Sequence, residues 1–178
     1  MNIIPEKRKK MGFTLIEMTL AVVLSVGIAA VIVVMVQQQI SITSTINRFS
    51  FLREDAPQIN VLMSNLITQA DDYRIYPNTA NAKAALNAVT EDGNAIRLRF
   101  RLPDGSIDNA IVAFETISGK KQLSFYYKDS GTPAWQTAPD WVVSSRPDVV
   151  RFSNNTGVLE ITLVGKYGEE VTFAGNPI

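Results

Sequence analysis

The chain has 178 residues, of which 46% are hydrophobic and 19% are charged, and its 17 basic and 17 acidic residues give a formal net charge of zero. It contains neither cysteine nor histidine, which excludes disulfides, a Ser-His-Asp triad, a cysteine nucleophile and the usual protein ligand sets for zinc, haem or iron–sulfur clusters. The length suffices for one domain with a hydrophobic core of its own.

The charge is distributed unevenly along the chain. Residues 1–12 contain four basic residues against the single acid Glu6, so residues 13–178 hold 13 basic and 16 acidic residues, a net charge of −3. Because binding to a phosphate backbone requires a basic surface, nucleic acid is not expected as a partner of the folded domain. The basic cluster consists of Lys7, Arg8, Lys9 and Lys10.

An apolar segment follows this cluster directly. Residues 13–36 include one charged residue, Glu17, and as a helix the segment would extend about 36 Å, enough to cross a hydrocarbon core of about 30 Å. It therefore predicts a transmembrane helix. A cleaved secretory signal is the alternative, but its apolar region is shorter, about 7–15 residues. The preceding basic residues favour a cytoplasmic N-terminus and an extracytoplasmic remainder.

The junction between the basic cluster and the apolar segment has a distinctive order of residues. Gly12 is followed by Phe13 and then by Thr-Leu-Ile-Glu at 14–17. This junction resembles the processing site of type IV pilins and of the pseudopilins of type II secretion systems, closely at residues 8–20 and loosely afterwards. The resemblance implies that prepilin peptidase removes residues 1–12 by cleaving after Gly12, and that the new amino group of Phe13 is methylated. Gly12 suits a cleavage site because an extended backbone without a side chain can approach a protease closely.

Glu17 is an acid within a predicted membrane span, and such residues are functional by default because burying their charge in lipid costs several kcal/mol. The resemblance implies that Glu17 pairs with the amino group of Phe13 in a neighbouring subunit during filament assembly. The alternative is an acid in the first helical turn, favoured there by the helix dipole.

The resemblance thus implies a structural subunit, a minor pilin or pseudopilin, that is held by a single span in the bacterial inner membrane and is then added to a filament in the periplasm or at the cell surface. Its partners would be prepilin peptidase and other pilin or pseudopilin subunits, with no cofactor, no metal, no small-molecule substrate and no enzymatic activity. Two alternatives remain: a membrane-anchored extracytoplasmic binding domain that does not polymerise, and an extracytoplasmic hydrolase based on carboxylates.

An amphipathic helix is predicted to continue the span through residues 37–72. Its apolar positions are three or four residues apart, which is typical of one helical face. Pro57 predicts a kink within a single helix, with Asp55 as a possible N-cap. The apolar positions are Ile42, Ile46, Phe49, Leu52, Ala56, Ile59, Leu62, Leu66 and Ala70.

Residues 73–94 are interpreted as a connecting loop with a short helical stretch, and residues 95–178 as a β-sheet domain. Alternating hydrophobicity and turn residues predict strands at 96–102, 111–117, 122–128, 148–152, 157–164 and 169–174. Short connections favour an antiparallel meander with one face on the amphipathic helix and the other in solvent. The expected class is therefore α+β, a long N-terminal helix packed on an antiparallel sheet, and the pilin resemblance implies the same fold.

Three groups of residues in the sheet domain are open to two interpretations each. The arginines either bind an acidic partner or form a solvated surface with acids across the sheet, such as Glu115. The acids and the amide either bind calcium or form turns. The tryptophans either dock a partner or pack on the sheet. The groups are Arg97, Arg99 and Arg101; Asp104, Asp108 and Asn109; and Trp135 and Trp141.

Overall fold

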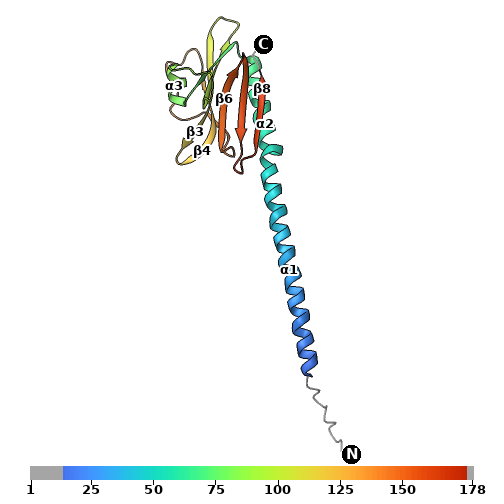
Figure 1. Cartoon of the computed structure of the whole chain (residues 1–178). Helices are drawn as coiled ribbons and strands as arrows, with labels where there is room; N and C mark the ends of the chain where they lie inside the picture. The colour runs from blue at the N-terminus through green and yellow to red at the C-terminus, as the bar shows by residue number, and fades with distance from the viewer. Residues whose placement is uncertain (1–13, 176–178) are drawn as a thin grey trace, which may run out of the picture. The chain divides into compact units, whose positions relative to one another are not determined.

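The computed structural model describes residues 14–175, except for the side chain of Arg48, and the chain divides into two compact units, Met1–Thr45 and Ile46–Ile178. Helix α1 (Leu15–Ser50) supplies the described part of the first unit (Figure 1). Its apolar side chains are exposed along its length, from Leu15 at 82% to Val36 at 47%. An apolar helix that no other part of its unit covers is typical of a membrane span. The described residues include one helical stretch long and apolar enough to cross a membrane, Leu15–Gln69.

A π-helical turn interrupts the regular helix before Pro57. The turn, η1 (Phe51–Asp55), leads into α2 (Ala56–Gln69), and the Ala56 N–H donates to the Phe51 carbonyl five residues earlier. Pro57 lies in the first turn of α2, where its missing N–H is tolerated. The predicted single helix through Pro57 is confirmed, whereas Asp55 makes no capping hydrogen bond. Its carboxylate instead pairs with Arg146 at 2.7 Å.

The buried face of this helix differs from the predicted stripe in two respects. Ile42, Ile46 and Phe49 are more than half exposed, and burial begins at Phe51. The π-helical turn brings Phe51 onto the same face as Ala56, five residues later, because its i→i+5 spacing adds a residue to one turn. The buried residues of the helix and its C-terminal end are Phe51, Ala56, Ile59, Met63, Ile67 and Ala70.

The remainder of the second unit forms two antiparallel sheets, so the predicted α+β class is confirmed (Figure 1). The five-stranded sheet follows chain order, with α3 (Thr79–Ala84) between its first two strands; its strands are β1 (Asp72–Tyr76), β2 (Ala95–Arg101), β3 (Ile107–Ile117), β4 (Lys120–Lys128) and β5 (Trp141–Ser144). The three-stranded sheet contains β6 (Val149–Asn155), β7 (Val158–Val164) and β8 (Glu170–Gly175). All six predicted strands are present, but β1 lies in the segment interpreted as a connecting loop, and β5 was not predicted.

The main hydrophobic core lies between α2 and the inner faces of both sheets. Met63 and Ile67 of α2 are buried there with Leu98 of β2 and Phe152 of β6. The opposite face of the five-stranded sheet carries a second, smaller core, in which Ala82 of α3 and the partly buried Trp135 cover the strands. The prediction that this face lies in solvent is therefore wrong. The side chains that the strands contribute to the second core are Tyr76, Ala95, Ile111, Ala113 and Tyr126.

Gly93 joins the two sheets. Its N–H donates to the Phe152 carbonyl at 2.9 Å, and its carbonyl accepts from the Phe152 N–H at 2.8 Å. A Cβ at position 93 would lie 2.8 Å from the Tyr76 carbonyl oxygen and would also overlap Ile75. Only glycine fits this close approach of three backbone segments.

We therefore expect Gly93→Ala to lower the free energy of unfolding by about 1–3 kcal/mol, the usual cost of overpacking. Gly131→Ala is the matched control, because the nearest atom to a Cβ there is Asp129 Oδ1 at 3.8 Å. Denaturant unfolding of the full chain in detergent, followed by circular dichroism, measures both variants. Equal midpoints for the two variants would contradict the close approach.

Candidate functional site

The first turn of α1 is closed by a reciprocal cap between Thr14 and Glu17. The Glu17 carboxylate accepts from the Thr14 backbone N–H at 2.8 Å and from its hydroxyl at 2.9 Å. The Glu17 N–H in turn donates to the Thr14 hydroxyl at 3.3 Å. This is a capping box, which satisfies two backbone donors that a helix start leaves without partners.

The capping box gives Glu17 a definite role in the first turn of its own helix. A first-turn role was the alternative to filament assembly that the sequence left open. Glu17 is also the one charged residue between Thr14 and Asn47, so residues 14–47 hold no cation that could neutralise it. Gly12, Phe13 and the basic residues Lys7, Arg8, Lys9 and Lys10 lie outside the described residues. The pairing of Glu17 with an amino group at Phe13 therefore stays a prediction.

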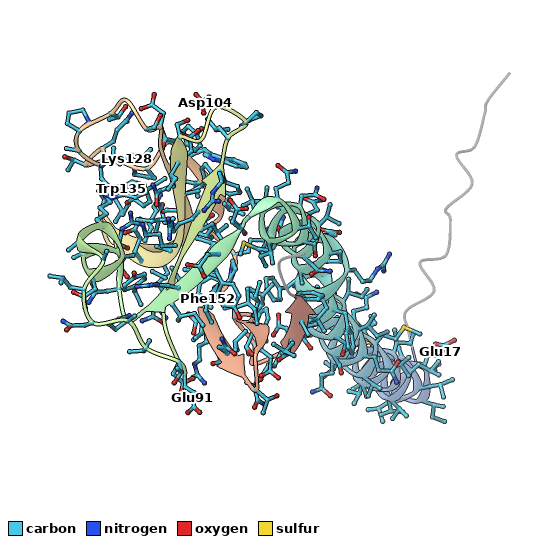
Figure 2. The ribbon with its side chains drawn as sticks, turned by 90° about the horizontal axis from the view of Figure 1, so that it is seen from above. Glu17, Glu91, Asp104, Lys128, Trp135 and Phe152 are labelled. Carbon is cyan, nitrogen blue, oxygen red and sulfur yellow. The ribbon has the colours of Figure 1, made fainter. Side chains whose placement is uncertain are left out.

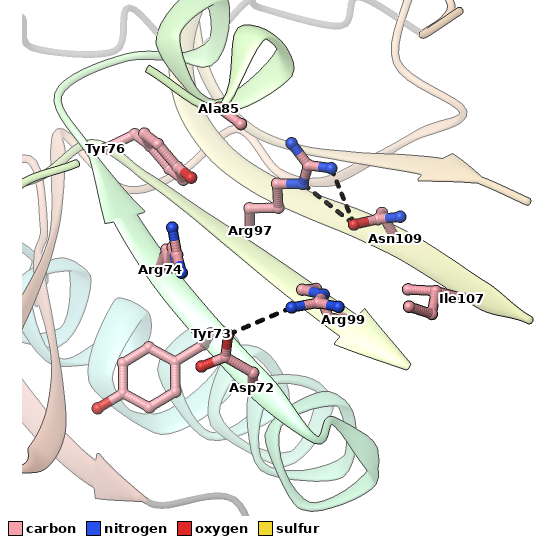
Figure 3. A pocket seen from close by; sticks show the side chains of 9 residues that line it. All are labelled: Asp72, Tyr73, Arg74, Tyr76, Ala85, Arg97, Arg99, Ile107 and Asn109. Atoms are coloured by element: carbon pink, nitrogen blue, oxygen red, sulfur yellow. Dashed lines mark hydrogen bonds and ion pairs between the residues drawn. The ribbon is translucent and has the colours of Figure 1, made fainter. Parts of the chain in front are cut away.

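A second candidate site is a pocket of about 340 Å³ on the outer face of the five-stranded sheet. Figure 3 shows side chains of three adjacent strands, β1, β2 and β3, around it, with the end of α3 at Ala85 above them. Arg74 of β1 lies directly opposite Arg97 of β2, and Asp72 lies opposite Arg99. Three guanidinium groups thus line one pocket with a single carboxylate. The lining residues are Asp72, Tyr73, Arg74, Tyr76, Ala85, Arg97, Arg99, Ile107 and Asn109.

Arg97 is held firmly in this pocket. Its Nε and Nη2 donate to Asn109 Oδ1 at 3.1 and 3.0 Å, its Nη1 donates to the Ala82 carbonyl at 3.4 Å, and its guanidinium lies 5.6 Å from the Trp135 ring centre (Figure 3). Of its five N–H groups, two remain without an acceptor in the described part of the chain. Burial lowers the pKa of Arg97, and the charges of Arg99 and Arg74 act in the same direction.

The other polar groups of the pocket are less constrained. Arg99 approaches the Asp72 carboxylate at 3.9 Å, and both side chains are nearly half exposed, so this ion pair is weak. The exposed Arg74 side chain makes no hydrogen bond or ion pair within residues 14–175. Tyr76 is 1% exposed, and its hydroxyl has no hydrogen-bond partner among the same residues.

The predicted arginine group is only partly brought together. Arg97 and Arg99 line the pocket, whereas Arg101 does not, and the third guanidinium is that of Arg74. Arg74 was missed because the β1 segment was interpreted as a loop. Glu115 does not face these arginines: its carboxylate accepts from the Thr79 hydroxyl at 2.7 Å and from the Tyr126 hydroxyl at 2.6 Å.

The acids and the amide considered for calcium serve separate local purposes. Asp104 caps its own turn by accepting from the Ser106 N–H and hydroxyl, and Asp108 accepts from the Tyr127 hydroxyl and the Ser130 N–H. Asn109 binds Arg97. Within residues 14–175, no three acidic side chains come together in a way that would hold a metal ion.

Both tryptophans contact the sheet. Trp135 packs on the second core, with the Lys128 amino group 5.9 Å from its ring centre (Figure 2). Trp141 begins β5, is 45% exposed, and meets Phe125 edge-on at 5.2 Å. Trp135 therefore follows the packing alternative, whereas Trp141 packs on Phe125 and also remains 45% exposed.

Comparisons with models of protein families, with curated proteins and with solved structures find no match to this chain. The architecture itself, a long apolar N-terminal helix followed by a β-sheet domain, fits a membrane-anchored protein with a single span. It is also compatible with a pilin-like fold.

Proposed function

We propose that this protein is a structural subunit of a type IV pilus-like or type II secretion pseudopilus filament. Prepilin peptidase removes residues 1–12, Phe13 is methylated, and the subunit waits in the inner membrane with its N-terminus in the cytoplasm and its sheet domain outside. It then joins other pilin or pseudopilin subunits through its N-terminal helix. The protein acts by polymerisation and is not an enzyme.

Glu17 is the observation that carries this proposal. It lies at the start of a long apolar helix without another charge as far as Asn47, in a helix whose side chains are exposed. A plain membrane anchor could close the same cap with an uncharged glutamine, whereas the charge of an acid raises the cost of insertion. A subunit that must align its helix with a neighbour gains a fixed register from one buried ion pair.

A membrane-anchored binding domain that does not polymerise is the second candidate. The arginine-lined pocket favours it, since three guanidinium groups with one acid make a surface suited to an anionic ligand. In that case the helix would serve only as an anchor, and neither cleavage after Gly12 nor the charge of Glu17 would matter.

The intact mass of the protein purified from its native membrane distinguishes the two candidates. We expect the protein to lack residues 1–12 and to carry one added methyl group, and we expect the full-length mass in cells without prepilin peptidase. Gly12→Val should keep the full-length mass in normal cells, because a branched side chain hinders the extended backbone at the cut, whereas the neighbouring control Met11→Leu should be processed. A full-length mass in normal cells would favour the binding domain.

A further inference from the structure

The arginine-lined pocket has an unfavourable charge arrangement that the fold alone does not explain. Arg74 and Arg97 are direct cross-strand partners, and like charges in this position destabilise an antiparallel pair. Arg99 adds a third positive group on the same face, and the nearest acid, Asp72, is 3.9 Å from it. The remaining lining side chains carry no negative charge.

The same groups are arranged as hydrogen-bond donors toward one space. Two N–H groups of Arg97 stay available although Asn109 and the Ala82 carbonyl fix the orientation of its guanidinium. Arg74 and the hydroxyl of Tyr76 have no acceptor within residues 14–175, and all three line the pocket (Figure 3). Because the Arg97 guanidinium is held in place before binding, it loses little entropy when a ligand arrives.

We propose that this pocket binds a small ligand through an oxyanion, a carboxylate or a phosphate group. Arg97, already oriented, receives the oxyanion in the fork of its guanidinium; Arg74 and Arg99 close around it, and the Tyr76 hydroxyl donates to it. Guanidinium groups match both kinds of oxyanion with paired N–H···O bonds. The volume of about 340 Å³ lies at the lower end of small-molecule sites. This site does not depend on whether the protein polymerises.

Isothermal titration of the full chain in a nonionic detergent tests the proposal, with inorganic phosphate and malonate as probes at constant ionic strength. Arg74→Gln removes one charge from the pocket, and the fold should tolerate it because Arg74 is exposed and makes no contact by hydrogen bond or ion pair in the described chain. Arg101→Gln is the matched control: it removes the same charge from the neighbouring strand β2, and Arg101 does not line the pocket.

We expect saturable binding of at least one probe, weakened about tenfold or more by Arg74→Gln and changed less than about twofold by Arg101→Gln, as for the loss of one charge-assisted hydrogen bond. Tighter binding of phosphate would indicate that the ligand of the pocket carries a phosphate group, and tighter binding of malonate would indicate that it carries a carboxylate. No saturable binding of either probe, or equal weakening by both variants, would overturn the proposal.

A thermal scan without either anion supplies an independent readout. Arg74→Gln should raise the unfolding midpoint slightly, because it removes the repulsion from Arg97, and it should abolish the midpoint increase that the anion causes in the unmodified protein. A midpoint lowered by Arg74→Gln would contradict the charge repulsion on which the proposed site is based.

Discussion

Replacing Glu17 by glutamine is expected to abolish incorporation of the protein into filaments while leaving its insertion into the membrane intact. The side chains differ in charge but hardly in size, so the proposed pairing with the amino group at Phe13 of a neighbouring subunit is lost. Leaving one charge of a buried ion pair without its partner costs about 3–5 kcal/mol, which corresponds to a loss of association of more than about a hundredfold. The amount of the protein in sheared filaments, relative to that in the membrane, measures the effect.

The capping box makes this substitution more informative than alanine. Glutamine can accept from the Thr14 N–H and hydroxyl as glutamate does, because either residue completes a capping box. Glu17→Ala removes the carboxylate half of the cap together with the charge. Thr14→Ala removes the hydroxyl half of the cap and keeps the charge, at a cost of about 0.5–2 kcal/mol in helix stability.

The three variants therefore separate two roles of one side chain. If the charge matters for assembly, Glu17→Gln and Glu17→Ala both fail and Thr14→Ala assembles. If Glu17 only caps its own helix, Glu17→Gln assembles normally and Thr14→Ala shows the larger defect. That second pattern would refute the role of the Glu17 charge in filament assembly. Absence of the unmodified protein from filaments would instead favour the membrane-anchored binding domain.

The elements that sequence reasoning predicted well are those with a long, unbroken period. The alternation of Ile96, Leu98 and Phe100 with arginines predicted β2, and in the structure Ile96 and Leu98 are fully buried in the main core. The apolar segment predicted the exposed part of α1 for a similar reason. In both cases one physical pattern, burial on one face or exposure to lipid, extends over enough residues to outweigh local irregularities.

The elements that were missed are short and lack a clear alternation of apolar and polar residues. Strand β1 has five residues, with Asp72 and Arg74 among them, and β5 has four in a stretch rich in proline and serine. The burial of Phe51 in place of the predicted Leu52 arises at a π-helical turn, for which the sequence offers no signal except the nearby Pro57. Missing β1 hid Arg74, and with it the charge arrangement of the pocket.

The capping box, by contrast, has a recognisable signal in the sequence. A threonine followed three residues later by a glutamate, at the start of an apolar run, is the pattern of a helix N-terminus. Thr14 was interpreted only as part of a processing motif, and the alternative for Glu17 was an acid favoured by the helix dipole rather than a capping residue. Residues 14–17 therefore both follow a local rule of helix formation and resemble part of a processing site. For this reason the sequence alone could not separate a capping role of Glu17 from a role in assembly.

The second large effect is expected in the main core, at Phe152. This side chain is fully buried between the two sheets and α2 (Figure 2), and its backbone makes both hydrogen bonds to Gly93 that join the sheets. Phe152→Ala should lower the free energy of unfolding by about 3–5 kcal/mol, from lost burial and the cavity left behind. That is a large part of the total stability of a domain, about 5–15 kcal/mol.

Denaturant unfolding of the full chain in detergent measures this change, with two reference variants. Phe152→Leu refills most of the space and should cost less than about 1.5 kcal/mol, and Tyr167→Ala removes an aromatic ring that is 52% exposed and should have a small effect. Equal midpoints for Phe152→Ala and Tyr167→Ala would show that Phe152 is not packed as the structure has it.

Phe152→Ala should also reduce incorporation into filaments, because it lowers the amount of folded protein. Glu17→Gln should reduce incorporation while leaving the unfolding midpoint of the sheet domain unchanged. Because the two variants differ in this way, a loss of filaments can be attributed either to folding or to assembly.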